Sequence, residues 1–279
     1  MTEKAPISLD AFIKLAFCLE GRDKLSKMLQ YGSRALAFYV LSADPKSDLG
    51  QRLHALFKVM QQSRKAFRLG KSVTYVKKLQ TLSSNKAVPE WQKYLQFIQN
   101  VGMLGYFFTD NVAFACKAKV LRFDAEELSR RGGVMWFCAN MAGFFSAVDN
   151  LNADVEKEKC VRDILASEDD ATRVEALQGQ LEALRSGRFK KLLAVLKVMC
   201  DLIVSSNTSG VRLAERITGT KLHDGIVGSV GCVSAAVVLY NTWPSAPKKV
   251  LPSSEKTEEK KDDAKTDAKW KMFGHVLEK

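Results

Sequence analysis

The sequence predicts an all-α membrane protein, with amphipathic helices in its N-terminal part and one or two transmembrane helices further on. Apolar residues recur at helical spacing along most of the 279 residues, and only six prolines interrupt them. One uncharged stretch, residues 225–247, is long enough as a helix to cross a bilayer core of about 30 Å. The net charge of +12 is concentrated in residues 1–82, which hold 15 basic and 6 acidic side chains.

The localised basic excess indicates an anionic partner, either nucleic acid or a phospholipid leaflet. The apolar stretch favours the leaflet, so we expect an anionic phospholipid membrane as partner, and neither nucleic acid nor a small-molecule substrate. A soluble helical nucleic-acid binder would use the same basic region and is the alternative class. Because the sequence shows no nucleotide-binding loop, no paired acid and base and no metal-ligand spacing, we expect no cofactor or metal, and an enzyme is the least favoured class.

Two helices are predicted at the N-terminus. Ser8 is a favourable N-cap, and the helix after it should run to about Leu41, before the sequence Asp44-Pro45. The second helix should begin near Ser47 or Asp48 and reach Gly70, which kinks or ends it. We assign residues 1–92 to a basic, amphipathic membrane-binding region.

Residues 71–82 predict a helix that lies in a membrane interface. On a helical wheel its apolar side chains fill one half and three lysines occupy the opposite sector. This pattern suits insertion among anionic headgroups, although an ordinary bundle helix with a solvated face shows it too. The predicted membrane-binding residues, which include the basic segment just before this helix, are Arg64, Lys65, Phe67, Arg68, Lys71, Val73, Val76, Lys77, Lys78, Leu79 and Leu82.

Residues 93–150 are predicted to form apolar helices with a candidate first span. Gly132 to Val148 contains no charged residue and would be roughly 26 Å long as a helix, which a thin bilayer accommodates. The alternative is an aromatic helix at the interface or packed against protein. Asp110, and later Asp201, interrupt apolar surroundings, so they either line a polar pathway or face protein or water.

The C-terminal half is divided into a charged helical segment (151–221), a transmembrane helix (222–247) and a disordered, charged tail (248–279). Trp243 and Lys248-Lys249 would mark the end of the span, and pairing it with Gly132–Val148 would leave both termini in the cytosol. Small residues four apart on this helix predict a self-association face or close helix packing. These predicted oligomerisation residues are Gly228, Gly231, Cys232 and Ala235.

Several segments together resemble one known family. Residues 21–34 read GRDKLSKMLQYGSR and resemble the N-terminal signature of the peroxisomal membrane protein 11 (peroxin-11) family. Residues 64–71 read RKAFRLGK and look like its second signature, which leads into the family's membrane-active amphipathic helix. Residues 107–111, the block around Trp136 and residues 224–234 are similar to its middle and C-terminal regions. The resemblance covers about residues 9–247.

The resemblance implies a protein of the peroxisomal membrane, or of the glycosomal membrane where the organism has glycosomes. Members of the family elongate, tubulate and help divide the organelle, self-associate, and recruit fission factors that include a dynamin-like GTPase. Both termini are expected to face the cytosol. The charged stretch 153–186 and the tail after Ser245 depart from the family pattern, so roles of the tail are not carried over. The alternative function is a pore-forming metabolite channel in the same membrane, with Asp110 and Asp201 along its path.

Overall fold

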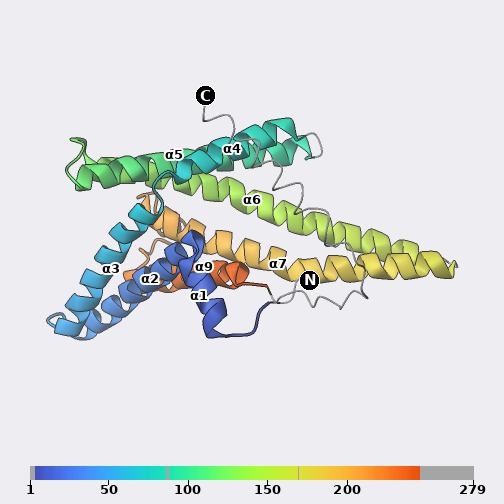
Figure 1. Cartoon of the computed structure of the whole chain (residues 1–279), viewed down its shortest axis with the longest axis horizontal. Coiled ribbons are helices and arrows are strands. Elements are labelled where there is room, and N and C mark those ends of the chain that lie inside the picture. The colour runs from blue at the N-terminus through green and yellow to red at the C-terminus, as the bar shows by residue number, and fades with distance from the viewer. Residues whose placement is uncertain (1–3, 86–87, 169, 246–279) are drawn as a thin grey trace, which may run out of the picture. The chain divides into compact units, whose positions relative to one another are not determined.

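The computed structural model describes residues 4–85, 88–168 and 170–245 (Figure 1). Residues 1–245 group into one compact unit, and its described part is built from helices without a strand, which confirms the predicted all-α class. The predicted tail, 248–279, lies outside the described residues. The helices are α1 (Leu9–Phe17), α2 (Leu19–Ala43), α3 (Asp48–Phe67), α4 (Lys71–Ser84), α5 (Glu90–Lys117), α6 (Ala125–Leu165), α7 (Ala171–Thr208), α8 (Leu213–Thr218) and α9 (Asp224–Thr242).

The N-terminal helix begins as the sequence predicts but breaks much earlier than expected. The Ser8 Oγ accepts a hydrogen bond from the Ala11 amide at 3.2 Å, which caps α1. Cys18 then takes an extended conformation and its sulfur accepts a hydrogen bond from the Gly21 amide, so α2 starts as a separate helix. The turn is so close that a Cβ at position 21 would overlap the backbone oxygen of Leu15. The predicted continuous helix to Leu41 is therefore wrong at Cys18.

The boundary between α3 and α4 follows the predicted signals. The Ser47 hydroxyl accepts a hydrogen bond from the Gly50 amide at 3.4 Å and caps α3. Gly70 has a φ of +72°, a left-handed conformation that favours glycine, and it separates the two helices. The chain thus changes direction between the basic end of α3 and the first lysine of α4.

The helix α6 passes through the predicted boundary at residue 150 without a break. Its 41 residues make it about 60 Å long, and Gly132–Val148 forms only its middle part. Asp124 caps its start by accepting hydrogen bonds from the amides of Glu126 and Glu127 at 2.8 and 3.1 Å. The predicted charged segment 151–221 therefore contains the end of α6 and the whole of α7 and α8.

The far ends of α6 and α7 lie side by side and are joined by ion pairs (Figure 1). Glu158 of α6 is 4% exposed and contacts Arg162 at 2.7 Å, Arg185 at 3.3 Å and Arg188. Lys191 of α7 forms a second pair with Asp154. The charges of this stretch therefore bind the two helices to each other.

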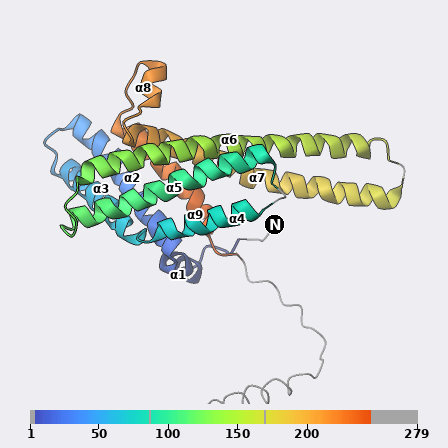
Figure 2. The same ribbon diagram turned by 90° about the horizontal axis from the view of Figure 1, so that it is seen from above.

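The remaining contacts place α9 next to one N-terminal helix and one C-terminal helix. It packs against α2 and α7, while α2 also contacts α3, α6 contacts α5 and α7, and α4 lies on α5 (Figure 2). Tyr31, Val204 and Val227 form a small apolar core, with Trp136 and Val230 packed against it. Segments from both ends of the chain thus build the same core.

Charged side chains are buried in this fold while large apolar ones are exposed. Tyr94, Phe97 and Phe108 of α5 are each more than half exposed. Lys, Glu, Arg and Asp are almost never fully buried unless they are paired, and inside membranes they face the bundle interior. This distribution is typical of a helical bundle with apolar surroundings. The buried charged residues include Asp23, Lys27, Arg64, Lys65, Arg68, Asp110 and Asp201.

Among the described residues, α9 is the one helix whose length and apolarity suit a membrane crossing. Its 19 residues have a mean hydropathy of 1.5 and give a length of about 28 Å. Within the described residues, the middle of α6, Gly132–Val148, is not apolar enough over a sufficient length to count as a second candidate. The chain is thus an all-α membrane protein with one candidate span, and the two-span topology stays a prediction.

Candidate functional site

The site lies where α3 ends and α4 begins, because the predicted membrane-binding residues cluster there. The structure separates them into two groups on either side of Gly70. The cations that precede Gly70 point into the bundle, whereas part of α4 remains on the surface. The two groups therefore have different surroundings, one inside the bundle and one at its surface.

The three cations at the end of α3 are buried in ion pairs. Arg64 Nε lies 3.1 Å from Asp23 Oδ1, and its Nη1 donates to Gln30 Oε1 at 2.6 Å. Lys65 and Arg68 each contact Asp110, at 3.1 Å. All three cations are less than 10% exposed. In this structure their charges are therefore satisfied by acids of α2 and α5, and contact of these three residues with headgroups stays a prediction.

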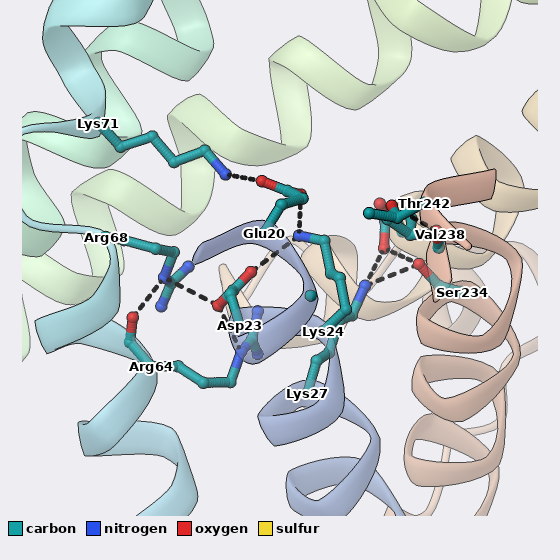
Figure 3. Close-up of polar contacts among 12 residues, drawn as sticks. Glu20, Asp23, Lys24, Lys27, Arg64, Arg68, Lys71, Ser234, Val238 and Thr242 are labelled. Carbon is teal, nitrogen blue, oxygen red and sulfur yellow. Dashed lines mark hydrogen bonds and ion pairs between the residues drawn. The ribbon is translucent and has the colours of Figure 1, made fainter. Parts of the chain in front are cut away.

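Asp23 is the acid at the centre of this group. Burial by itself would raise the pKa of Asp23, but the charges of Arg64, Lys24 and Arg68 outweigh it and hold the pKa well below 3.8. The carboxylate is thus ionised at neutral pH. Since Arg64 and Arg68 come from α3 and Asp23 from α2, this ion-pair group fixes the two helices against each other (Figure 3).

The group extends to the first turn of α4 through a shared acid. Glu20 of α2 contacts Lys24 at 3.0 Å and Lys71 at 2.9 Å (Figure 3). Lys71 is half-buried, so it links α4 to α2 instead of standing free among the predicted interface lysines. The N-terminal turn of α4 is therefore held by charge.

A second buried group joins α2, α7 and the candidate span. Lys27 Nζ lies 2.7 Å from Asp201 Oδ1 and donates to Ser234 Oγ of α9 at 2.7 Å. The Ser234 hydroxyl also donates to Asp201 at 2.6 Å, and Lys197 contacts the other carboxylate oxygen at 2.9 Å. Burial lowers the pKa of Lys27 to about 8; Asp201 opposes this shift and Arg64 adds to it.

Both groups line one cavity of about 640 Å³. Asp110 and Asp201, which the sequence singled out, both border it, and each is paired with cations. Sequence reasoning missed that seven of the fifteen basic residues in the first third border this cavity. The available signal was the set of isolated acids at positions 23, 110 and 201, each next to an apolar or basic stretch.

The predicted apolar half of α4 contains some side chains that pack against α5 and others that are exposed. Tyr75 stacks on Phe107 of α5 with ring centroids 5.5 Å apart, and Leu82 is 8% exposed. Val73 and Val76 are 69% and 44% exposed. The helix α4 lies along α5 (Figure 2), packs on it with part of its apolar half and leaves Val73 and Val76 exposed.

The other predicted residues of this segment are intermediate or exposed. Phe67 and Leu79 are partly buried, and Lys77 is exposed. Lys78 is exposed as well, but its Nζ lies 4.4 Å from the centre of the Tyr75 ring and it borders the cavity. The two lysines therefore differ in position although they are adjacent in sequence.

The small residues of α9 pack against α2 of the same chain. A Cβ at Gly228 would lie 2.6 Å from the Ala35 amide nitrogen and 2.7 Å from the Tyr31 carbonyl oxygen. Gly231 faces the Tyr31 ring, and Ala235 is fully buried. In this structure α2 occupies the face that holds Gly228 and Gly231, which is the close helix packing offered as the alternative, and self-association through it stays a prediction. Cys232 is partly buried, and its sulfur lies 3.6 Å from the Met28 carbonyl oxygen.

Sequence comparison identifies the family to which this helical arrangement belongs. A family-wide model described as Peroxisomal biogenesis factor 11 (PEX11) matches residues 9–243, which is most of the chain. The chain belongs to the PEX11 family. The resemblance seen in its sequence motifs is thereby confirmed, and the family's role is in peroxisome biogenesis.

Similar proteins occur in a slime mould, a plant and a yeast. The Peroxisomal membrane protein 11 homolog of Dictyostelium discoideum is 23% identical over 245 residues, covering 85% of this chain and 94% of the relative. Peroxisomal membrane protein 11A of Arabidopsis thaliana is 26% identical, with 81% and 88% covered. Peroxisomal biogenesis factor 11 of Schizosaccharomyces pombe is 22% identical, with 83% and 93% covered. No solved structure matches the chain.

Proposed function

We propose that this protein remodels the peroxisomal membrane by inserting the exposed face of α4 into one leaflet. The observation that carries the proposal is the exposure of Val73 and Val76, 69% and 44%, beside the exposed Lys77 on the same short helix. Membership in the PEX11 family supports the setting, since the family acts in peroxisome biogenesis. Apolar and cationic side chains together suit the boundary between acyl chains and headgroups.

The mechanism is an expansion of one leaflet relative to the other. Burying a valine side chain contributes about 1.5–3 kcal/mol, and a lysine near an anionic surface adds about 1 kcal/mol. The pair Lys71–Glu20 and the stacking of Tyr75 on Phe107 hold α4 to the bundle. Insertion of α4 would thus be transmitted to the whole protein, which α9 anchors in the membrane. Several copies acting together would elongate the organelle.

The family resemblance supplies the finer parts of the proposal. We propose a location in the peroxisomal membrane, or the glycosomal membrane where the organism has glycosomes, with both termini in the cytosol. We also propose that the protein is not an enzyme, that it self-associates, and that it recruits fission factors including a dynamin-like GTPase. Because α2 covers Gly228 and Gly231, self-association would use a different surface.

The alternative of a metabolite pore receives less support from the same structure. A polar pathway would use the acids Asp110 and Asp201, which do border the cavity. However, Asp110 contacts Lys65 and Asp201 contacts Lys27, so their charges are neutralised by neighbouring helices. Their contacts are those of residues that hold helices together, and membrane remodelling is therefore the function we favour.

The experiment replaces the exposed valines in the full chain reconstituted with anionic vesicles. In Val73→Asp with Val76→Asp, insertion should fail because two charges enter the exposed apolar face, while folding should persist because neither side chain is buried. Vesicle tubulation, scored by negative-stain electron microscopy, should be lost. In cells the variant should stay on peroxisomes through α9 but no longer elongate them.

The matched control places the same two charges on the polar side of α4. Thr74 and Thr81 are exposed, and their hydroxyls donate to backbone oxygens within the helix. The variant Thr74→Asp with Thr81→Asp should bind vesicles somewhat less at low salt but still tubulate them. Normal tubulation by the valine variant, or an equal loss in both variants, would rule out insertion of the apolar face as the cause.

A further inference from the structure

The charged cavity has the size and the chemistry of a ligand site. Its volume of about 640 Å³ lies within the range of roughly 300–1,000 Å³ typical of small-molecule sites. Side chains of α2, α3, α4, α5, α6 and α7 border it, and α9 contributes Val238. Ten of the bordering residues are basic and five are acidic. The basic ones are Lys24, Lys27, Arg64, Lys65, Arg68, Lys71, Lys78, Lys117, Arg130 and Lys197.

A basic excess remains after the ion pairs of these residues are taken into account, including the pair of Arg130 with Glu127, which lies outside the cavity lining. Four of the bordering acids, Glu20, Asp23, Asp110 and Asp201, contact seven cations between them. Positive charge that is removed from water and lacks a full complement of acids is unfavourable. An anion of more than one negative charge would balance it.

Lys78 is the cavity lysine that most clearly lacks an acid partner. Among the described residues it has no ion pair, and its Nζ lies 4.4 Å above the Tyr75 ring. Burial lowers the pKa of Lys78, and repulsion from Lys71 and Lys197 lowers it further, against an opposing effect of Glu20. Lys78 therefore faces Lys71 and Lys197 without an acid of its own, whereas Lys71 is paired with Glu20 and Lys197 with Asp201.

The donor groups of the cavity favour phosphate. Arg64 and Arg68 carry planar guanidinium groups of the kind that binds phosphate oxygens, and a ligand would share them with the acids that they already contact. Amide side chains of Gln99 and Asn100 add neutral donors around the same space. A group with several negative oxygens satisfies more of these donors than a single carboxylate would.

We propose that this cavity binds a small anion that carries phosphate groups, presented either as a free phosphate compound or as the headgroup of a phospholipid. The site lies beneath α4, and Lys78 and Lys71 belong to both. Its occupation would neutralise the cations that the acids leave unbalanced and would hold α4 against α2 and α7. The inference does not depend on membrane insertion by Val73 and Val76.

The experiment uses the full chain and two probes that separate the sources of phosphate. Binding of inositol 1,4,5-trisphosphate to the protein in neutral detergent, at low ionic strength, is measured by isothermal titration calorimetry. In parallel, protein in nanodiscs of neutral lipid is compared with protein in nanodiscs that also contain phosphatidylinositol 4,5-bisphosphate. Fluorescence at Trp136, which borders the cavity, gives a second signal, read against a Trp136→Phe variant.

Adjacent lysines of α4 supply the test variant and its control. Lys78→Gln removes one cation from the cavity, whereas Lys77→Gln removes one from the outer surface of the same helix. For the soluble probe we expect the first to weaken binding about tenfold, since it loses a charge-assisted hydrogen bond, and the second less than about twofold. Circular dichroism and melting temperature establish that both variants are folded.

Each outcome decides the proposal. Binding of the soluble probe with the Lys78 dependence supports it and identifies a free phosphate compound as a ligand. A thermal shift and a Trp136 response only with the phosphoinositide lipid, again dependent on Lys78, supports it with a headgroup as ligand. Equal losses for Lys77→Gln and Lys78→Gln would overturn it, because general surface charge would explain the binding. Absence of binding by both probes would overturn it as well.

Discussion

The end of α3 and the start of α4 are neighbours in sequence and carry similar basic residues, yet they have opposite surroundings. Arg64 and Arg68 are 8% and 7% exposed and lie beside Asp23. Across Gly70, Val73 is 69% exposed and Lys77 is exposed too. The comparison shows that a basic motif next to an amphipathic helix does not by itself make one continuous membrane surface. The cations of α3 hold the bundle together, and α4 presents the surface.

The largest effect should follow from removing the acid that pairs with the α3 cations. In Asp23→Ala, Arg64 and Arg68 lose a buried partner, which should cost about 3–5 kcal/mol of unfolding free energy. For a chain of this size that corresponds to a fall of roughly 10 °C in melting temperature. Thermal unfolding in detergent, followed by circular dichroism, measures it.

The control for this substitution is an exposed acid with one partner. Asp48 pairs with Arg52 at 2.8 Å, and both side chains are more than 70% exposed. Asp48→Ala should change the unfolding free energy by at most about 1 kcal/mol. A similar small change for Asp23→Ala would contradict the structural role given to the end of α3.

A smaller effect should appear in the dependence of stability on pH. The pKa of Asp23 lies below its ordinary 3.8 in the folded protein, so its contribution to stability is present above about pH 4 and is lost as the pH falls further. Asp201 has a lowered pKa as well and contributes in the same direction, because the nearby Lys27 and Lys197 outweigh its burial. The wild-type protein should therefore lose stability on acidification.

The variant Asp23→Asn separates the contribution of Asp23 from the rest. Its difference from the wild type in melting temperature should be greatest near pH 7 and should narrow as the pH falls from 4 to 3. Melting curves at pH 7, 5, 4 and 3 measure the difference. If the difference in melting temperature between the two proteins stayed constant from pH 7 to pH 3, the ionised carboxylate would not be what stabilises the end of α3.

The smallest effect on stability should come from the exposed lysine of α4. Lys77→Gln should change the unfolding free energy by less than about 0.5 kcal/mol, because Lys77 is exposed. It should nevertheless weaken binding to anionic vesicles by about 1 kcal/mol at low salt, which is roughly fivefold. Vesicle sedimentation at two salt concentrations measures this, and the difference should shrink at the higher one.

Arg64→Gln is the counterpart of this change in α3. It should lower stability more than Lys77→Gln does, since it removes one partner of a buried pair. If Arg64→Gln left stability unchanged and weakened only vesicle binding, the contrast between α3 and α4 would disappear. The prediction that Arg64 contacts headgroups would then regain its support.

Local signals in the sequence predicted much of the helical framework. The Ser8 and Ser47 caps, the break at Gly70 and the apolar helix α9 all depend on residues close together in the chain. The break at Cys18 escaped prediction, because the helical pattern continues across it and the turn depends on close packing of Gly21 against Leu15. Helical periodicity reports which face is apolar but not where a helix stops for packing reasons.

The sequence by itself determined the helical class, the membrane character and the family, since these follow from composition, periodicity and motifs. Only the tertiary structure decided which way the cations point. Arg64 is buried because Asp23, 41 positions earlier, is there to pair with it, and Gly228 packs against Tyr31 from the opposite end of the chain. The sequence around a basic side chain does not distinguish a lipid headgroup from a distant carboxylate as its partner. The difference arises only when folding brings the helices together.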